Sequence, residues 1–529
     1  MPALSRTTCL IVGFIASGLC ATAAQNPASQ PSSTPATAKD AAIIAELEAM
    51  KKRIEQLEAE LAEMKAESNP RAENLQGSAG AAPHGPNPIA SSLVEKQVEP
   101  SSQVPPKPQK PDPFAFADWT WLTGNPRTRT PAFDSKFFTP EVRTDVDYIY
   151  DFNHPRDNTI GGSSEVFRAN EVQLTQLGVG GDFHYDNVHA RLMTQFGMYS
   201  QTTPRNDASP ARGQWNLDNA YRYVSEAYGG YHFNALYGVN VDAGIFMSYV
   251  GLFSYYNFDN WAYQPSYVSS NTPWFFNGVR VQIFPTEHLK IEPWFTNGWQ
   301  SYGRFNNRPG VGGQIMWRPN GSWSITGNQY LLGEDALNTP GRVRYHTDDS
   351  VQYKFYDNPE RFFDKAALTL TGDMGCEHGG GVSCWGNSPQ GPKQSFLGFM
   401  SYGRVWFDKD LYAITVGGGR INNPGRYLVL LPPINGATAA SGTPYFTENP
   451  GDPYKAWDIS TTFDYMPSQY ITFRWENNHR AANVPYFSGS GGVTPPGGNT
   501  GSPGYVVAGW SPDLRKTEDR LNMAILVKF

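Results

Sequence analysis

The larger, carboxyl-terminal part of the chain consists of paired segments of alternating apolar and polar residues, joined by very short turns. Residues 183–185 and 188–190 flank Asp186-Asn187, and residues 405–407 and 411–416 flank residues 408–410. Long irregular stretches follow the pairs, near residues 200–217, 250–275, 332–345, 373–394, 421–455 and 480–515. A period of two is typical of strands with one apolar face. Tight turns at one end and long loops at the other indicate an all-β fold, a transmembrane antiparallel β-barrel.

The alternation of short turns and long loops also allows the strands to be counted. They are expected to begin near residues 140, 171, 188, 218, 239, 276, 289, 309, 322, 345, 365, 395, 411, 455, 470 and 516. The barrel, residues 140–529, is therefore predicted to have about 16 strands, with 14 or 18 as alternatives because boundaries are the weakest part of a pattern-based assignment. In the second strand Leu174 and Leu177 differ in parity, which predicts a bulge around residues 176–181.

The last nine residues form a strand of their own. Leu521, Met523, Ile525, Val527 and Phe529 alternate with mostly polar or small residues, and the chain ends on the aromatic one. This pattern resembles the closing strand of outer-membrane barrels, so Phe529, Val527 and Ile525 are expected to act as the signal for the membrane-assembly machinery. Soluble β-sandwiches can also end on a strand, so the pattern alone does not decide between them.

The amino-terminal region is expected to be separate from the barrel. Residues 1–24 combine Arg6, a short apolar core and an A-x-A site, which predicts a cleaved signal peptide; Cys20 leaves a lipid anchor as an alternative. In residues 40–67 an apolar seam follows heptad spacing and predicts a short coiled coil, with a lone amphipathic helix as the alternative. The seam residues are Ile43, Leu47, Met50, Ile54, Leu57, Leu61 and Met64.

Two further segments join the predicted coiled coil to the barrel. Residues 68–113 are rich in Pro, Ser and Ala and predict an extended, disordered linker. Residues 114–139, with Trp119 and Trp121, precede the first strand and are named here the pre-barrel segment. This segment is expected either to plug the barrel or to lie at the membrane surface.

Composition excludes several classes of protein. After the signal peptide no apolar run is long enough for a helical membrane span, and a net charge of −7 argues against a nucleic-acid partner. Cys376 and Cys384 lie close together in a Gly-rich stretch of an exported chain, which predicts a local disulfide. His378 alone cannot complete a metal site, so no metal and no cofactor are expected.

Strand parity assigns charged residues to the inside of the barrel, because a charge facing lipid near mid-membrane costs about 2–4 kcal/mol for Arg or Lys. Charges of both signs indicate an aqueous interior rather than a packed core. These charges either brace the wall by ion pairs or tune selectivity, notably through the arginines. The candidate pore-lining residues are Arg143, Asp145, Asp147, Arg191, Arg222, Glu226, Arg280, Glu292, Arg404, Asp464, Arg474 and Glu476.

Residues 250–275 form the third external loop, which in general porins folds into the pore; that transfer is an analogy. If it holds, the aromatic rings could stack on sugar rings, whereas the alternative places them in an interfacial girdle or cap. The constriction-loop candidates are Tyr255, Tyr256, Asp259, Trp261 and Tyr263.

Several short motifs resemble the β-barrel porin-2 (OmpL-like) family over about residues 140–529. They are residues 147–155 (DYIYDFNHP), 226–228 (EAY), 241–246 (VDAGIF), 260–261 (NW) and 277–280 (NGVR). The resemblance implies an outer-membrane porin-like barrel with no catalytic residues and no fixed substrate. The predicted coiled coil and linker lie outside it.

The sequence therefore predicts a porin in the bacterial outer membrane, with the coiled coil and linker in the periplasm. Small hydrophilic solutes, with sugars among the candidates, would diffuse passively through it. The expected partners are outer-membrane lipid, the assembly machinery and further copies of the chain, with a trimer favoured. A non-conducting structural barrel that anchors the coiled coil is the main alternative, and an outer-membrane enzyme is the weaker one, because the histidines lie in no nucleophile motif.

Overall fold

The computed structural model describes residues 48, 51–52, 56, 110–124, 131–161, 166–207, 213–253, 255–333, 341–386, 391–425, 452–498 and 505–529. The chain divides into two compact units, residues 1–80 and 81–529. In the first unit the described residues, Glu48, Lys51, Lys52 and Gln56, are helical. The predicted signal peptide, the seven seam residues of the coiled coil and the linker up to residue 109 lie outside the described residues.

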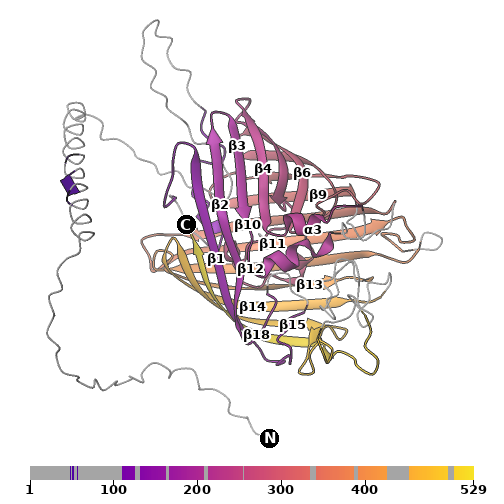
Figure 1. Cartoon of the computed structure of the whole chain (residues 1–529). Helices are drawn as coiled ribbons and strands as arrows, with labels where there is room; N and C mark the ends of the chain where they lie inside the picture. Colours follow the sequence, from indigo (N-terminus) through magenta and orange to yellow (C-terminus); the bar gives the residue numbers. More distant parts are fainter. Residues whose placement is uncertain are drawn as a thin grey trace, which may run out of the picture. The chain divides into compact units, whose positions relative to one another are not determined.

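The second unit is a closed antiparallel barrel of 16 strands (Figure 1). Each strand pairs with its neighbours in sequence, and β1 closes the barrel against β18. The wall strands are β1 (Phe138–Asp151), β2 (Val172–Tyr185), β3 (Val188–Thr194), β4 (Val224–Phe233), β5 (Val239–Met247), β6 (Phe275–Thr286), β7 (Leu289–Thr296), β8 (Gly310–Trp317), β9 (Trp323–Gly333), β10 (Val343–Asp357), β11 (Phe363–His378), β12 (Ser395–Phe407), β13 (Tyr412–Asn422), β14 (Lys455–Ser468), β15 (Ile471–Ala482) and β18 (Thr517–Lys528).

Short elements occupy the connections between wall strands. β16 (Phe487–Ser488) pairs with β17 (Leu514–Arg515) in the last long loop. The helices are η1 (Thr120–Leu122), α2 (Tyr199–Thr202), η2 (Thr203–Asn206), α3 (Leu217–Tyr221), η4 (Asn257–Asp259) and α4 (Tyr267–Ser270). Among the described residues, none of the helices has the length and apolarity needed to cross a membrane.

The predicted strand count of 16 is confirmed, and most strands begin within two residues of the expected positions. The fourth is the exception. Its expected start near residue 218 is wrong, because residues 217–221 form α3, whose amino end is capped by the Asn216 side chain. The register shift in β2 lies opposite Asp145 and Val146, at Thr175, one residue before the predicted bulge.

The closing strand lies where the alternation places it. Figure 1 shows β1 and β18 side by side, and Arg143 pairs with Lys528 at one end of the seam. Val142 and Phe529 exchange backbone hydrogen bonds of 3.2 and 2.9 Å, and the Phe529 ring stacks on Tyr470. Ile525 is 46% exposed, whereas Leu526 is buried. The outward face is therefore apolar, as predicted.

The wall obeys the same alternation elsewhere. Along β14, residues 456–466 alternate between buried inward positions and more exposed outward positions. Apolar side chains dominate the exposed set, including Phe399, Trp457 and Phe463. Asp349 on β10 is an exception, an exposed carboxylate in the middle of its strand.

The expectation of an aqueous interior without a packed core is wrong in part. Trp121, Trp261 and Trp406 belong to one buried apolar cluster, and Phe276 and Trp299 belong to another. The reason is that the β5–β6 loop and the pre-barrel segment turn inward and pack against the wall. Buried aromatic side chains and buried charges therefore share the interior.

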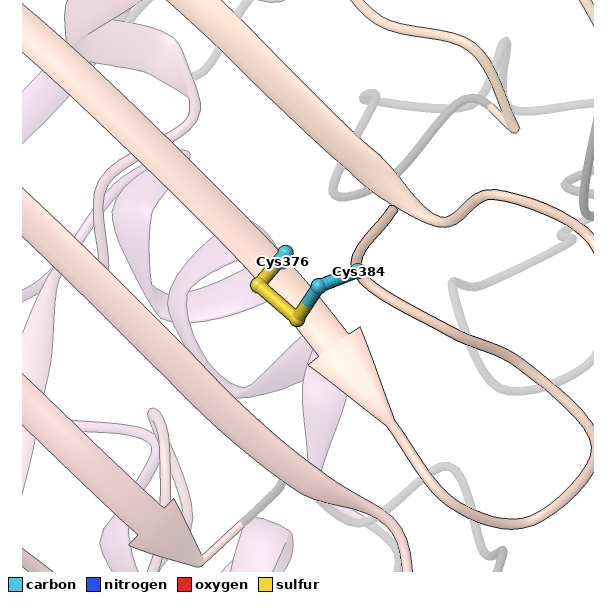
Figure 2. The surroundings of a disulfide bond; sticks show 2 residues. All are labelled: Cys376 and Cys384. Carbon is cyan, nitrogen blue, oxygen red and sulfur yellow. A yellow bond between two sulfur atoms is a disulfide. The ribbon is translucent and has the colours of Figure 1, made fainter. Parts of the chain in front are cut away.

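The predicted disulfide between Cys376 and Cys384 is present, with a Cα–Cα distance of 5.0 Å. Figure 2 shows Cys376 near the end of its strand, β11, and Cys384 in the loop that follows. The disulfide therefore holds the start of this long loop to the wall.

Candidate functional site

The β5–β6 loop, residues 248–274, is the centre of the candidate site. Tyr256, Trp261 and Tyr263 are each at most 2% exposed, although the loop is long and connects neighbouring strands. Its contacts reach β1, β12, β14 and β15, which lie far from β5 and β6 around the barrel. The loop therefore crosses the interior to the opposite wall.

Tyr263 anchors the loop to β1. Its hydroxyl donates to Asp145 Oδ1 at 2.8 Å and lies 2.9 Å from Asp147 Oδ2. Burial raises the pKa of the Tyr263 hydroxyl well above its usual range, so it remains a neutral donor. Both carboxylates are also buried, and an unpaired buried carboxylate is costly. The Tyr263 hydroxyl therefore offsets part of the cost of burying these two neighbouring aspartates.

Glu476 on β15 holds the loop backbone. Its Oε2 accepts the Tyr263 N–H at 2.6 Å, and its Oε1 accepts the Gln264 N–H at 2.9 Å. The Thr462 hydroxyl and the Asn522 amide donate to the same carboxylate. Hydrogen bonds to a charged acceptor are stronger than neutral ones, which makes Glu476 a principal loop anchor.

Two more carboxylates anchor the loop. Asp458 Oδ2 on β14 accepts the Ser266 hydroxyl at 2.8 Å and the Tyr267 N–H at 3.0 Å. Asp259 of the loop accepts from Arg143 at 3.1 Å, and the Arg143 guanidinium lies 4.0 Å from the centre of the Tyr256 ring. Charged side chains of the wall therefore pair with polar groups of the loop at both ends of residues 259–267.

Three charged residues of the wall, on β12, β14 and β15, form a group that faces the loop. Asp464 accepts from Arg404 at 2.7 Å and from Arg474 at 2.6 Å. Both arginines also donate to loop carbonyls, Arg404 to Trp261 O and Arg474 to Asn257 O. One carboxylate between two arginines leaves a positive charge, which the carbonyl oxygens of the loop partly offset.

The pre-barrel segment approaches the loop from the end of the barrel that carries the short turns. The Phe114 N–H donates to Glu287 O in the β6–β7 turn, and Arg318 of the β8–β9 turn stacks on Trp119. Farther along, Trp261 Nε1 donates to Trp121 O at 3.2 Å.

The contact between segment and loop continues at Gly124. The Gly124 N–H donates to Asp259 O at 2.9 Å. A Cβ at Gly124 would lie 1.9 Å from Asn260 O, so this close approach requires glycine. Of the two alternatives for residues 114–139, the contacts of 114–124 favour the one inside the barrel. Contacts with the barrel begin before this segment, because Lys110 donates to Leu236 O.

The sequence profile of the family described as "Putative beta-barrel porin-2, OmpL-like" matches residues 144–503. The chain belongs to this family. It is thus an outer-membrane porin by family and by barrel fold. No curated protein sequence matches it.

Several solved barrels resemble this porin at low identity. The outer membrane channel DcaP of Acinetobacter baumannii is 11% identical, with a TM-score of 0.41 over 76% of this chain and 100% of that one. The anion-selective porin from Comamonas acidovorans is 10% identical, with a TM-score of 0.41 over 74% and 99% of the two chains. The trimer form of OmpT, an outer membrane protein of Vibrio cholerae, is 8% identical, with a TM-score of 0.42 over 75% and 100%.

The structure brings most of the porin's predicted site residues together. Beside the loop lie Arg143, Asp145, Asp147, Arg404, Asp464, Arg474, Glu476 and Glu226, the last accepting from Tyr256 at 3.0 Å. Other candidates lie inside the barrel in smaller groups of charged and polar residues, one of which shares Glu226 with the loop. Arg191 contacts Glu141, Asp182 and Glu226; Arg280 contacts Asp242; and Glu292 contacts Lys290 and Gln282.

Two predictions about individual residues are wrong. Arg222 lies at the carboxyl end of α3, where it pairs with Asp218, rather than on the fourth strand. The loop aromatics do not offer free faces to sugars, because they are buried: Tyr255 packs on Tyr199, and Trp261 packs on Trp406.

Sequence reasoning did not select Asp458 as a site residue or connect Trp121 with the loop. Strand parity does point Asp458 inward, like Asp464 on the same strand, but it does not single it out from the other inward charges as a contact of the loop. The contact between Trp261 and Trp121 joins residues separated by 140 positions, and no local pattern encodes it. No cluster of three or more His, Cys, Asp or Glu residues able to hold a metal ion is found in the described parts of the chain.

Proposed function

We propose that this porin forms a water-filled channel through which small hydrophilic solutes, including sugars, diffuse passively across the outer membrane. The single observation that carries the proposal is the sorting of the wall: apolar outside, and charged with both signs inside. A barrel of this strand number encloses more space than wall side chains alone fill. An interior that served only as a core would be expected to be apolar.

We further propose that the β5–β6 loop and the pre-barrel segment set the width of the channel. They meet inside the barrel, through the contacts of Asp259 with Gly124 and of Trp261 with Trp121.

The predicted coiled coil and the Pro-rich linker precede the pre-barrel segment in the chain. On this proposal the coiled coil lies in the periplasm and joins copies of the chain into an oligomer, with a trimer favoured.

Current through planar lipid bilayers tests the proposal. The purified full-length protein should insert as discrete steps whose current is proportional to voltage, and proteoliposomes should swell in isotonic sugar. Trp121→Ala should raise the conductance of a step, because it weakens the packing between segment and loop. Trp385→Ala is the matched control, since Trp385 is 77% exposed.

The alternative, a non-conducting structural barrel, is favoured by one specific observation, the buried aromatic clusters in the interior. It predicts no steps from correctly folded protein and no sugar-dependent swelling. That result, obtained with both the parent and Trp121→Ala, would contradict the channel proposal.

A further inference from the structure

A pair of aspartates on the inner wall lies apart from the loop anchors. Asp348 on β10 and Asp373 on β11 are direct cross-strand partners, and they are 0% and 1% exposed. None of their four carboxylate oxygens accepts a hydrogen bond of good geometry within the described part of the chain, although the Asn328 amide lies beside Asp348 and the Met374 N–H beside Asp373. Like charges directly opposite each other on neighbouring strands destabilise a sheet. Another group must therefore offset the repulsion between these two carboxylates.

Two hydroxyl groups lie beside this pair. Ser350 and Thr371 are also direct cross-strand partners, and each is two positions from one of the aspartates. Residues two apart on a strand point to the same face, so all four side chains face the same region. Ser350 is 3% exposed and Thr371 is 0% exposed, and their hydroxyls have no hydrogen-bond partner among the described residues.

The basic groups close to the pair do not neutralise it. Arg344, on the same face of β10, donates to Glu377 at 2.8 Å. His346 Nε2 lies 2.9 Å from Asp373 Oδ1, but without hydrogen-bond geometry. Even a protonated His346 would balance only one of two ionised carboxylates. A buried charge without a partner costs several kcal/mol.

We propose that Asp348, Asp373, Ser350 and Thr371 form a binding site for a hard divalent cation, with Ca²⁺ as the best match. Ca²⁺ takes six to eight oxygen ligands from carboxylates, other oxygens and water. The four side chains offer up to six oxygens, counted as two from each carboxylate and one from each hydroxyl. A bound cation would remove the repulsion between the aspartates and tie β10 to β11.

The oxygen-only donor set also indicates which metals fit poorly. Three or more His, Cys, Asp or Glu residues do not converge on one point among the described residues, so a zinc site of the usual kind is not supported. In the proposed site two carboxylates supply the charge and two hydroxyls complete the set of oxygen ligands.

The proposed cation site does not depend on whether the barrel conducts, because its evidence comes from β10 and β11 alone.

Terbium luminescence offers a direct test, because Tb³⁺ replaces Ca²⁺ in oxygen sites and is excited through a nearby tryptophan. Trp299 is suitably placed, since its ring lies 4.6 Å from the His346 ring between centroids. The full-length protein, purified in detergent and treated with chelator, should give Tb³⁺ emission that Ca²⁺ displaces. Ca²⁺ alone should also raise its melting temperature.

Variants separate this site from adventitious binding. Asp348→Asn and Asp373→Asn should each lower the Tb³⁺ emission at least tenfold and remove the Ca²⁺-dependent rise in melting temperature. Asp349→Asn is the matched control, because Asp349 is the next residue but is exposed on the outer face. It should retain both signals. Trp299→Phe should lose most of the emission yet keep the Ca²⁺-dependent rise in melting temperature.

Three results would overturn the proposal. The first is emission that survives in both aspartate variants. The second is a melting temperature of the parent that is independent of Ca²⁺, which would indicate a proton shared between the carboxylates. The third is an unchanged affinity for Ca²⁺ in Ser350→Ala/Thr371→Ala. This milder variant replaces the aspartate variants if those do not fold.

Discussion

Replacement of Glu476 by glutamine is expected to release the β5–β6 loop from the wall. The carboxylate accepts four hydrogen bonds, two of them from the loop N–H groups of Tyr263 and Gln264. Glutamine keeps the shape but has one acceptor oxygen and one NH₂ group. Either orientation of the amide turns NH₂ toward one loop N–H.

The free energy by which Glu476→Gln favours release of the loop can be estimated from these contacts. The Thr462 hydroxyl can rotate and the Asn522 amide can flip, so both can adapt to the new side chain. The loop N–H that faces NH₂ cannot adapt, and an unsatisfied buried donor costs about 1–3 kcal/mol. The remaining loop hydrogen bond loses its charged acceptor, a loss of about 1 kcal/mol. The sum, about 3 kcal/mol, corresponds to a shift of about 100-fold toward the released loop.

Two measurements follow the loop in the folded barrel. In planar bilayers Glu476→Gln should switch more often between current levels, and limited proteolysis should cut residues 248–274 faster than in the parent. Glu292→Gln is the matched control: it removes an inward carboxylate whose contacts are Gln282, Lys290 and Trp294 rather than the loop. If Glu476→Gln and Glu292→Gln behave alike in both assays, the assignment of Glu476 as a loop anchor is wrong.

Three other changes have defined outcomes. Cys376→Ser/Cys384→Ser should cost about 2–3 kcal/mol of local loop stability, seen as faster proteolysis between these positions at an unchanged barrel melting temperature; equal proteolysis would contradict it. Deletion of Phe529 should impair assembly in cells much more than refolding in detergent, and equal effects on both would remove its role as a signal. Leu57→Asn/Leu61→Asn should weaken oligomers in chemical cross-linking if the heptads associate; unchanged cross-linking would exclude that role.

The wall could be predicted from the sequence because its rules are local. Alternation fixes which side chains face lipid, and short turns fix where strands begin, so Ile525 and Asp464 lie on the predicted faces. The error at Arg222 is also local in origin. The Asn216 cap and the pair of Asp218 with Arg222 favour a turn of helix where alternation alone suggests strand.

The contents of the interior could not be predicted in the same way. Tyr263 meets Asp145 across 118 positions, and Trp121 meets Trp261 across 140. Such contacts depend on how a closed barrel places opposite walls relative to a loop, which no periodicity records. Parity shows that a charge points inward, but it does not distinguish water from a loop carbonyl as its neighbour.

The pairing of the inward charges bears on selectivity. Arg191 has three carboxylate partners at 2.9 Å, and Arg280 lies 2.8 Å from Asp242. A charge neutralised at such distances has little field left to act on a passing ion. Removal of one partner of a buried pair costs about 3–5 kcal/mol, so Arg191→Gln and Arg280→Gln should lower the melting temperature. An arginine lost alone leaves its carboxylates unpaired, so the test of selectivity is Arg280→Gln/Asp242→Asn, which removes the whole pair. Its reversal potential in a salt gradient should remain close to that of the parent, and a large shift would show that the pair acts on passing ions rather than only braces the wall.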